Sequence, residues 1–394
     1  MKTAGIISEY NPLHLGHAGH IKKTRQAIGD SCAVVCVMSG NFVQRGDFAV
    51  FNKHARAKAA VLCGADLVIE LPLPYSLSSA EGFAAAGVYI LDCLGVCDHL
   101  SFGSESGDIN ALKEAADAIA SAEADRITKE WLGKGLPYAS ARQRAADAIM
   151  GEHADVFKTP NNLLGIEYLK AITLLGSAMQ PITVKRTGGE HDSDTGFSAS
   201  ALRKMLLRGE PPWESMPKAA ASVCKEEIAA GRGPVFANSC ELAVLSRLRA
   251  IKDFSSIPGA SEGLDRRLMR YAVSEPTVSS ILNNAKTKRY AMSRLRRMLM
   301  CACLGITAED TLKPPPYIRV LATNRTGIRL LRTARQNNKL PIITKPASAK
   351  RLPERAARMF DKEADATDFY ALAYRDENQR FGGQEWRHTP VVVD

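Results

Sequence analysis

The sequence predicts an α/β protein in which a Rossmann-like parallel-sheet domain is followed by a mainly helical, basic domain. Two observations lead to this fold class. Short apolar runs alternate with longer helical patterns over residues 1–206, which is typical of a parallel sheet with helices on both faces. After the turn-forming segment Gly209–Pro212, the patterns are mainly helical.

The five expected strands are short and mostly apolar: Thr3–Ser8, Ala33–Met38, Leu67–Leu71, His99–Phe102 and Ile182–Lys185. Helices are expected between them at His17–Ile28, Lys53–Cys63, Ser79–Cys93, Ile109–Ser121, Ala139–Ile149 and Gly165–Leu175. Later helical patterns are Cys240–Ala250, Glu262–Val273, Thr277–Leu282 and Tyr290–Leu304, with a strand pattern at Tyr317–Thr323. We therefore expect two domains, residues 1–208 and 209–394.

Composition favours a cytoplasmic globular protein. Of the 394 residues 45% are hydrophobic, and no run approaches the roughly 18 apolar residues of a membrane span. The start of the chain has no signal-peptide pattern. The nine cysteines lack the spacing of a disulfide framework, so we expect reduced thiols, mostly in the core. The sequence leaves the oligomeric state open.

The net charge of +10 is unevenly distributed. Residues 241–350 contain 21 Lys and Arg against 7 Asp and Glu, a net charge of +14, so the rest of the chain carries −4. A basic segment of this size indicates a polyanionic partner. The sequence therefore suggests that the first half performs chemistry and the second half binds a polyanion.

The most informative segment follows the first expected strand, where a turn at Asn11-Pro12 leads to His14-x-Gly16-His17. A helix N-terminus binds phosphates through free N–H groups, and a glycine lets a nucleotide lie close to the backbone. Two imidazoles can stabilise the charge that develops when a phosphate is attacked. We expect nucleotide contacts at Ile7, Ser8, Glu9, Tyr10, Asn11, Pro12, Gly16 and His20, and catalytic roles for His14 and His17.

Two other interpretations of these histidines stay open. His17 and His20 are three residues apart and can share a zinc-binding helix face, or the histidines are incidental. The spacing Pro12-x-His14-x-Gly16-His17 nevertheless resembles the HIGH motif of the nucleotidyltransferase superfamily. The resemblance implies ATP as the nucleotide, and we expect no metal ligands.

A second motif, Ser198-Ala-Ser200-Ala-Leu-Arg203, follows the last expected strand of the first half. A serine that caps a helix presents its hydroxyl and N–H groups to phosphates, and an arginine one turn later offers a charged fork to pyrophosphate. The motif resembles the Ile-Ser-Ser-Thr-x-Ile-Arg element of small-molecule adenylyltransferases, which implies ATP binding by Ser198 and catalytic roles for Ser200 and Arg203. Ala199 and Ala201 depart from that element. A plain serine-capped helix is the alternative.

Four residues at other strand or helix ends complete the predicted ATP cleft: Gly103, Asn162, Lys185 and Arg186. The glycine allows adenine or ribose to approach, the Asn162 amide can bond to either, and the two cations lie where phosphate is expected. A turn glycine, a helix cap and surface charges explain the four equally well. Residues 39–47, after the second strand, are expected to border a second substrate.

Five segments together resemble a narrower family, the bacterial tRNA(Met) cytidine acetate ligases: Ser8-Glu-Tyr-Asn-Pro, Ser39-Gly-Asn-Phe-Val-Gln-Arg-Gly, Phe102-Gly-Ser-Glu, Pro160-Asn-Asn and Phe197-Ser-Ala-Ser. The resemblance covers essentially the whole chain. It implies that ATP activates acetate as acetyl-adenylate and that the acetyl group passes to N4 of the wobble cytidine of elongator tRNA(Met). Mg²⁺ is expected with ATP, although the sequence shows no carboxylate cage for it. No residue stands out as a base for the cytidine amine.

The expected tRNA contacts are basic residues in the second half: Arg266, Arg267, Arg270, Lys286, Lys288, Arg289, Arg294, Arg296 and Arg297. Basic stripes follow a phosphate backbone, and Tyr290 among them can stack on an unpaired base. A further stripe at helical spacing consists of Arg325, Arg329, Arg332 and Arg335. Each cluster alone is also typical of a solvated helix face.

Two alternative functions stay open, a small-molecule adenylyltransferase and a non-catalytic RNA-binding protein that senses ATP. The first leaves the basic half without a role, and intact His14, His17 and Arg203 argue against the second. An aminoacyl-tRNA synthetase is disfavoured because the Ser-Ala-Ser element lacks the lysine pair of the KMSKS motif.

Overall fold

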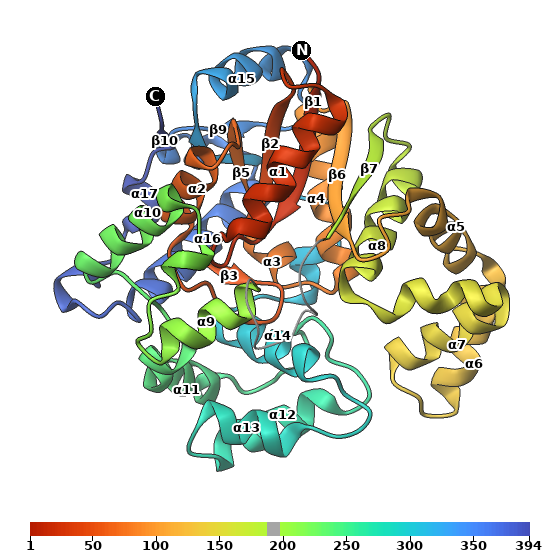
Figure 1. Cartoon of the computed structure of the whole chain (residues 1–394). Coiled ribbons are helices and arrows are strands. Elements are labelled where there is room, and N and C mark those ends of the chain that lie inside the picture. The colour runs from red at the N-terminus through yellow and green to blue at the C-terminus, as the bar shows by residue number, and fades with distance from the viewer. Residues whose placement is uncertain (187–197) are drawn as a thin grey trace.

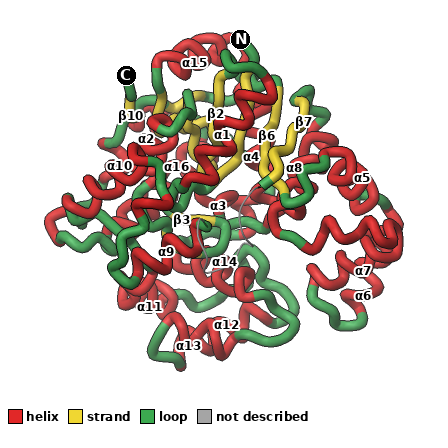
Figure 2. Tube along the Cα trace, in the orientation of Figure 1, coloured by secondary structure: helices red, strands yellow, loops and turns green. Residues whose placement is uncertain are grey.

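An eight-stranded sheet runs through the centre of the molecule in the computed structural model, which describes residues 1–186 and 198–394 (Figures 1 and 2). The strand order is β10-β8-β5-β2-β1-β6-β7, with β9 beside β8. The five strands predicted in the first half are confirmed and run parallel: β1 (Thr3–Ser8), β2 (Ala33–Ser39), β5 (Leu67–Leu71), β6 (His99–Ser104) and β7 (Gln180–Lys185). The second half adds β8 (Ile318–Thr323), β9 (Ile342–Ile343) and β10 (Val391–Val392).

Helices cover both faces of the sheet because successive side chains of each strand point to opposite sides. On one face, Val34, Cys36 and Met38 of β2 join a core with residues of four helices: α1 (Leu15–Ile28), α2 (Lys53–Leu62), α9 (Ala199–Leu207) and α10 (Lys218–Ala229). On the other face, Val35 and Val37 join a core with residues of α4 (Ala80–Leu94), α8 (Pro160–Leu175) and α16 (Glu354–Ala371).

Two groups of helices lie outside this three-layer arrangement. One forms a lobe beside α8, coloured brown to yellow in Figure 1: α5 (Ile109–Ile119), α6 (Ala122–Gly133), α7 (Tyr138–Met150) and the 3₁₀ segment η1 (Gly151–Lys158). The other has its own core, which includes Leu245, Leu268, Ile281 and Leu295: α11 (Glu241–Ala250), α12 (Leu264–Ser274), α13 (Val278–Ala285) and α14 (Met292–Cys303). This second core also takes in Phe42 and Phe48 from an unpredicted hairpin, β3 (Phe42–Val43) and β4 (Asp47–Phe48).

The expected domain boundary at 208/209 falls between α9 and α10, but the sheet contains strands from both sides of it. Strand β8 pairs antiparallel with β5, so the chain returns to the sheet after α14. The mainly helical basic part is therefore an insertion between α9 and β8. The remaining elements are α3 (Leu73–Ser76), α15 (Arg325–Asn337), α17 (Gln384–Arg387), η2 (Trp213–Ser215), η3 (Ala237–Cys240), η4 (Ala308–Thr311), η5 (Pro346–Arg351) and η6 (Glu377–Gln379).

Helices α11–α14 and α15 lie at opposite ends of the sheet (Figure 1). Because β8 is antiparallel to β5, its carboxyl end lies beside the amino end of β5, where the Asn324 N–H donates to the Asp66 oxygen at 3.1 Å. Helix α15 starts from this point. In contrast, α14 contacts β4, which lies beyond the carboxyl end of β2. The arginine stripe of α15 is therefore remote from the other basic helices.

Candidate nucleotide-binding and catalytic site

The carboxyl ends of the neighbouring strands β1, β6 and β7 bring together the segments that the sequence assigned to a nucleotide cleft. Strands β2 and β5, which follow β1 in the sheet along the chain, lie on one side of β1. Strand β6, which comes later, lies on its other side. Ligands of open parallel sheets bind at such a reversal of strand order. At this point His20 Nε2 lies 3.1 Å from Ser101 Oγ, which joins α1 to β6.

His14 and His17 form the start of α1. His14 is the N-cap residue, and its Nδ1 accepts a hydrogen bond of 3.0 Å from the Gly16 N–H, while His17 Nδ1 accepts one of 3.3 Å from the His14 N–H. The two rings stack at a centroid distance of 3.7 Å. A Cβ atom on Gly16 would lie 2.9 Å from His14 Cε1, so the glycine leaves room for this ring. Since both Nδ1 atoms accept hydrogen bonds, the neutral rings carry their protons on Nε2.

These imidazoles are neutral at pH 7. Burial lowers the pKa of His14 to about 4 and that of His20 to about 4, and the positive charge of Arg186 acts in the same direction. Burial, together with His14, also lowers the pKa of His17 well below its ordinary value. The rings of His14 and His17 therefore offer Nε2–H donors to a phosphate without burying a cation, in the manner of other neutral catalytic histidines.

Other predicted contacts in the turn after β1 also hold the fold together. The Asn11 Oδ1 atom accepts a hydrogen bond of 2.8 Å from the Val50 N–H. Tyr10 adopts a left-handed backbone (φ 45°) and packs edge-on against His17 at 5.1 Å. Ile7 and Pro12 are buried, and the Ser8 hydroxyl makes no hydrogen bond to any described residue.

Helix α9 brings the second motif to the first. Ser198 is its N-cap residue and accepts a hydrogen bond of 3.1 Å from the Ala201 N–H, which confirms the predicted serine cap. Arg203 donates to the main-chain oxygen of Asn11 at 2.8 Å and to Ser200 Oγ at 3.3 Å. The two motifs therefore meet at the end of β1. The residues just before Ser198, which belong to the resemblance, lie outside the described residues.

The remaining predicted ATP contacts lie around the ends of β6 and β7. Asn162 Oδ1 accepts hydrogen bonds from the Glu105 and Ser106 N–H groups at 3.0 and 3.2 Å, which leaves its Nδ2 group without a bond to any described residue. Gly103 lies under Arg186, because a Cβ atom there would be 3.2 Å from Arg186 Cγ. Lys185 packs along Gly107, whose φ of +68° and close approach both require glycine.

Arg56 is a buried residue that sequence reasoning missed. Its guanidinium donates to the main-chain oxygens of Glu9 at 2.5 Å, Phe51 at 2.9 Å and Ser39 at 3.0 Å, and also to that of Gly40. One side chain thus fixes the end of β1 relative to the end of β2. The sequence signal is weak, because an arginine in the predicted helix Lys53–Cys63 looks like a surface residue.

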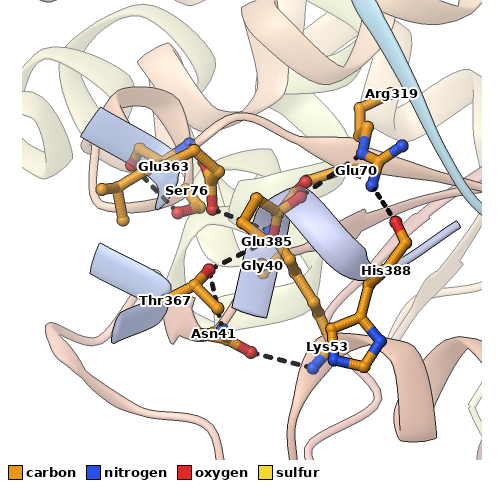
Figure 3. Close-up of polar contacts among 12 residues, drawn as sticks. Gly40, Asn41, Lys53, Glu70, Ser76, Arg319, Glu363, Thr367, Glu385 and His388 are labelled. Atoms are coloured by element: carbon orange, nitrogen blue, oxygen red, sulfur yellow. Dashed lines mark hydrogen bonds and ion pairs between the residues drawn. The ribbon is translucent and has the colours of Figure 1, made fainter. Parts of the chain in front are cut away.

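A buried ionic cluster, also missed, lies beside Gly40 and Asn41 in the loop after β2 (Figure 3). Lys53 Nζ is fully buried and lies 2.7 Å from Glu70, 2.7 Å from Glu385 and 3.3 Å from Glu363. Arg319 is the second buried cation, 3.4 Å from Glu385. The sequence signal was Glu70 itself, because a carboxylate inside the apolar strand Leu67–Leu71 needs a buried partner.

The pKa values of two glutamates in this cluster shift in opposite directions. Burial and the charge of Glu363 raise the pKa of Glu70 well above its ordinary value, although the charge of Lys53 lowers it again. Burial alone would raise the pKa of Glu385, but the charges of Lys53 and Arg319 lower it to about 2. Two buried cations, Lys53 and Arg319, therefore face three buried glutamate side chains. Asn41 connects the cluster to the loop after β2, because its Oδ1 accepts from the Lys53 N–H at 2.9 Å.

The nine predicted tRNA contacts differ in their exposure. Arg267, Arg294 and Arg297 are partly buried, and Arg267 donates to the Ala285 and Asn284 oxygens at the end of α13. Tyr290 is buried and donates to the Glu262 oxygen at 2.9 Å, so its predicted stacking on a base is not supported. The exposed members are Arg266, Arg270, Lys286, Lys288, Arg289 and Arg296.

Among residues 1–186 and 198–394, no group of three or more His, Cys, Asp or Glu side chains is arranged to hold a metal ion. His17 and His20 therefore do not belong to such a group within the described chain. No helix in the described part is both long and apolar enough to span a bilayer. All nine cysteines are free thiols, as their spacing predicted.

Known proteins resemble this chain in sequence and in fold. The model of the HIGH nucleotidyltransferase family matches residues 1–385. The tRNA(Met) cytidine acetate ligase of Acetivibrio thermocellus is 35% identical over the whole of both chains, and that of Caldanaerobacter subterraneus is 38% identical over 95% of this chain and 96% of its own. The chain belongs to the tRNA(Met) cytidine acetate ligase family.

Solved structures agree with membership of the tRNA(Met) cytidine acetate ligase family. Thermotoga maritima TmcAL bound with α-thio ATP matches all of this chain with a TM-score of 0.92 and 33% identity. The apo form of the same T. maritima protein matches with a TM-score of 0.93 and 32% identity. The family fold thus accepts an ATP analogue in the T. maritima protein.

Proposed function

We propose that this chain uses ATP to activate acetate as acetyl-adenylate and then transfers the acetyl group to N4 of the wobble cytidine of elongator tRNA(Met) in the cytoplasm. The observation that carries the proposal is the meeting of the two nucleotide motifs, where Arg203 bonds to Asn11 beside His14 and His17. Sequence identity of 35% and 38% over at least 95% of the chain to relatives named tRNA(Met) cytidine acetate ligase supports the choice of substrates.

In the first step an acetate oxygen attacks the α-phosphorus of ATP, the bond from phosphorus to the bridging oxygen breaks, and pyrophosphate leaves. The Nε2–H groups of His14 and His17 and the N-terminus of α1 stabilise charge on the α-phosphate. Ser200 and Arg203 hold the departing pyrophosphate. Mg²⁺ carried by ATP would neutralise part of the phosphate charge, and no described group of His, Cys, Asp or Glu side chains is arranged to hold it. Catalysis in this step is positioning and charge stabilisation.

The ATP site extends along the strand ends of β6 and β7. Asn162 offers its Nδ2 group to the adenine or ribose, and Arg186 supplies a charge beside the stacked histidines. Lys185 closes β7 at the same edge of the sheet. A small-molecule adenylyltransferase would use the same residues but would give α11–α14 no role.

The direct test is acetate-dependent exchange of pyrophosphate into ATP without tRNA, compared with propionate and other small acids. Exchange with acetate, followed by N4-acetylcytidine in tRNA(Met) on nucleoside analysis by mass spectrometry, is the expected result. If exchange occurs only with a phosphorylated small molecule, the adenylyltransferase is correct. If ATP binds but neither exchange nor acetylation occurs with tRNA present, the chain is an ATP-sensing RNA-binding protein.

A further inference from the structure

The hairpin of β3 and β4, residues 42–48, connects the nucleotide site to the basic helices. At its tip, the Gln44 N–H donates to Glu9 Oε1 at 2.7 Å, which ties the hairpin to the turn after β1. Gly46 lies directly against α14, since a Cβ atom there would be 2.4 Å from the Arg297 nitrogen and 2.5 Å from the Arg296 carbonyl carbon. The hairpin therefore touches both the ATP motif and the helix predicted to bind RNA.

The base of the hairpin is rigid. Phe42 and Phe48 are buried and contact each other at a ring-centroid distance of 4.9 Å, and Phe48 stacks on Tyr370 at 5.9 Å. Asp47 is paired with Val43 across the two strands. The backbone that carries the Asp47 side chain is thus held from both sides.

Asp47 is a partly buried carboxylate without an ion pair. Its Oδ1 atom accepts a hydrogen bond of 2.8 Å from the N–H of the next residue, Phe48, and the carboxylate forms no salt bridge with any described residue. The positive charges of Arg296 of α14 and Arg203 of the nucleotide site act on this carboxylate. A charge in such a position, with one oxygen free, is suited to bind a group that arrives from outside.

We propose that Asp47 binds the exocyclic amine of the acceptor nucleotide and takes its proton during acetyl transfer. The assignment rests on the proposed function, because it needs acetyl-adenylate in the site. The amine lone pair attacks the acetyl carbonyl carbon and a C–N bond forms. The bond from that carbon to the phosphate oxygen breaks, and AMP leaves with the electron pair. The amine proton passes to the Asp47 carboxylate and then to water.

The other groups near the hairpin that could accept a proton already have hydrogen-bond partners or another expected role. Glu9 Oε1 accepts the hydrogen bond from Gln44, and His14 and His17 stand at the phosphate end of α1. Burial raises the pKa of the Asp47 carboxyl above its ordinary value, although the charges of Arg296 and Arg203 lower it again. The raised pKa makes Asp47 a stronger base than an exposed aspartate. Arg296 is exposed beside it, where an incoming phosphate backbone can bind.

The test separates the two half-reactions in the full-length protein. Asp47→Asn is expected to keep acetate-dependent ATP–pyrophosphate exchange and to slow single-turnover acetyl transfer to tRNA(Met) about 10²- to 10⁴-fold. Asp47→Glu should restore much of the transfer. As a control, Asp253→Asn removes an exposed carboxylate that accepts a similar local hydrogen bond, from the Ser255 N–H, and should affect neither reaction.

Three outcomes would overturn the assignment. Normal transfer by Asp47→Asn would show that another group takes the proton. Equal loss of exchange and transfer would place Asp47 in the nucleotide site. If the unaltered protein shows no exchange with acetate, with or without tRNA, the proposed function fails and this role fails with it.

A second variant tests the contact between the hairpin and α14. In Gly46→Ala the new Cβ atom would lie 2.4 Å from the main chain of α14, so the helix has to move away. We expect this variant to show reduced acetyl transfer but normal ATP–pyrophosphate exchange. Gly135→Ala is the matched control: its φ of +85° imposes comparable backbone strain, but its Cβ atom would meet nothing within 4 Å. Equal effects of the two substitutions on transfer would mean that contact with α14 is irrelevant.

Discussion

Arg203 Nη1 donates a hydrogen bond of 2.8 Å to the main-chain oxygen of Asn11, although the two residues are 192 positions apart in the sequence. The contact places a guanidinium beside the N-terminus of α1, so that the groups expected to bind the α-phosphate and the pyrophosphate share one edge of the sheet. We therefore expect the adenylation step to depend on this hydrogen bond.

Replacing Arg203 with lysine keeps the charge but removes the two-pronged donor. Because the guanidinium is expected to stabilise the leaving pyrophosphate, Arg203→Lys should slow ATP–pyrophosphate exchange about 10²- to 10³-fold. Its affinity for tRNA should not change, as measured by filter binding. Arg208→Lys, at the exposed end of the same helix, is the control. Unchanged exchange in Arg203→Lys would remove this arginine from the catalytic site.

The side chains of Arg266 and Lys288 are exposed and form no hydrogen bond or ion pair with another described residue, so they are free to bind phosphates. Reversing both charges should weaken tRNA binding and reduce the slope of log K against log salt by about 1.5. Exchange without tRNA should stay normal. Reversal of Arg332 and Arg335 on the remote helix α15 is the control. If only the α15 variant weakens binding, tRNA docks at the other end of the sheet.

Lys53→Met removes a cation that three buried glutamate side chains share. A buried pair that loses one partner leaves charge uncompensated, so we expect the free energy of unfolding to fall by about 3–5 kcal/mol. Lys58→Met, one turn further along α2, breaks only the exposed pair with Glu226 and should cost about 0–1 kcal/mol. Urea unfolding of both variants measures the difference. Similar losses would show that Lys53 is not essential to the cluster.

The stability of the protein should fall on mild acidification. His14 and His20 have pKa values of about 4 in the folded chain against an ordinary 6.5, so between these values the unfolded chain binds more protons. Their contribution is therefore fully present above pH 6.5 and is lost as the pH falls toward 4. Urea unfolding across this range should show a shallower pH dependence for His14→Asn combined with His20→Asn, but not for the exposed control His153→Asn.

Sequence patterns were sufficient to predict the strands of the first half and the two nucleotide motifs that follow them. The strands are continuous apolar runs, and the two motifs are short segments whose spacing carries their chemistry. The strand at 318–323 was also predicted from its apolar run, but its partner was not. Nothing local in a strand reveals whether it pairs with β5, and this pairing places the C-terminal residues in the sheet and not in a separate domain.

Long-range contacts account for what the sequence did not reveal. The three glutamates that surround Lys53 come from β5, α16 and α17, and their meeting depends on packing. Tyr290 looked like a base-stacking residue because it lies among cations, but the tertiary structure buries it. Asp47 ends the segment 39–47 that the sequence placed beside a second substrate, but its role as a base was not predicted, because the charges of Arg296 and Arg203 reach it only when α14 and α9 fold against the hairpin.

The buried cluster also has a consequence for how the protein is made. Lys53 leaves the ribosome 310 residues before Glu363, and Glu385 follows later still. Until those residues emerge, Lys53 has only one of its three glutamate partners, Glu70, and the edge of β5 that later pairs with β8 is open. Domains that fold during synthesis expose such edges to aggregation. We therefore expect the nascent chain to need chaperone protection and to acquire ligase activity only when its translation is nearly complete.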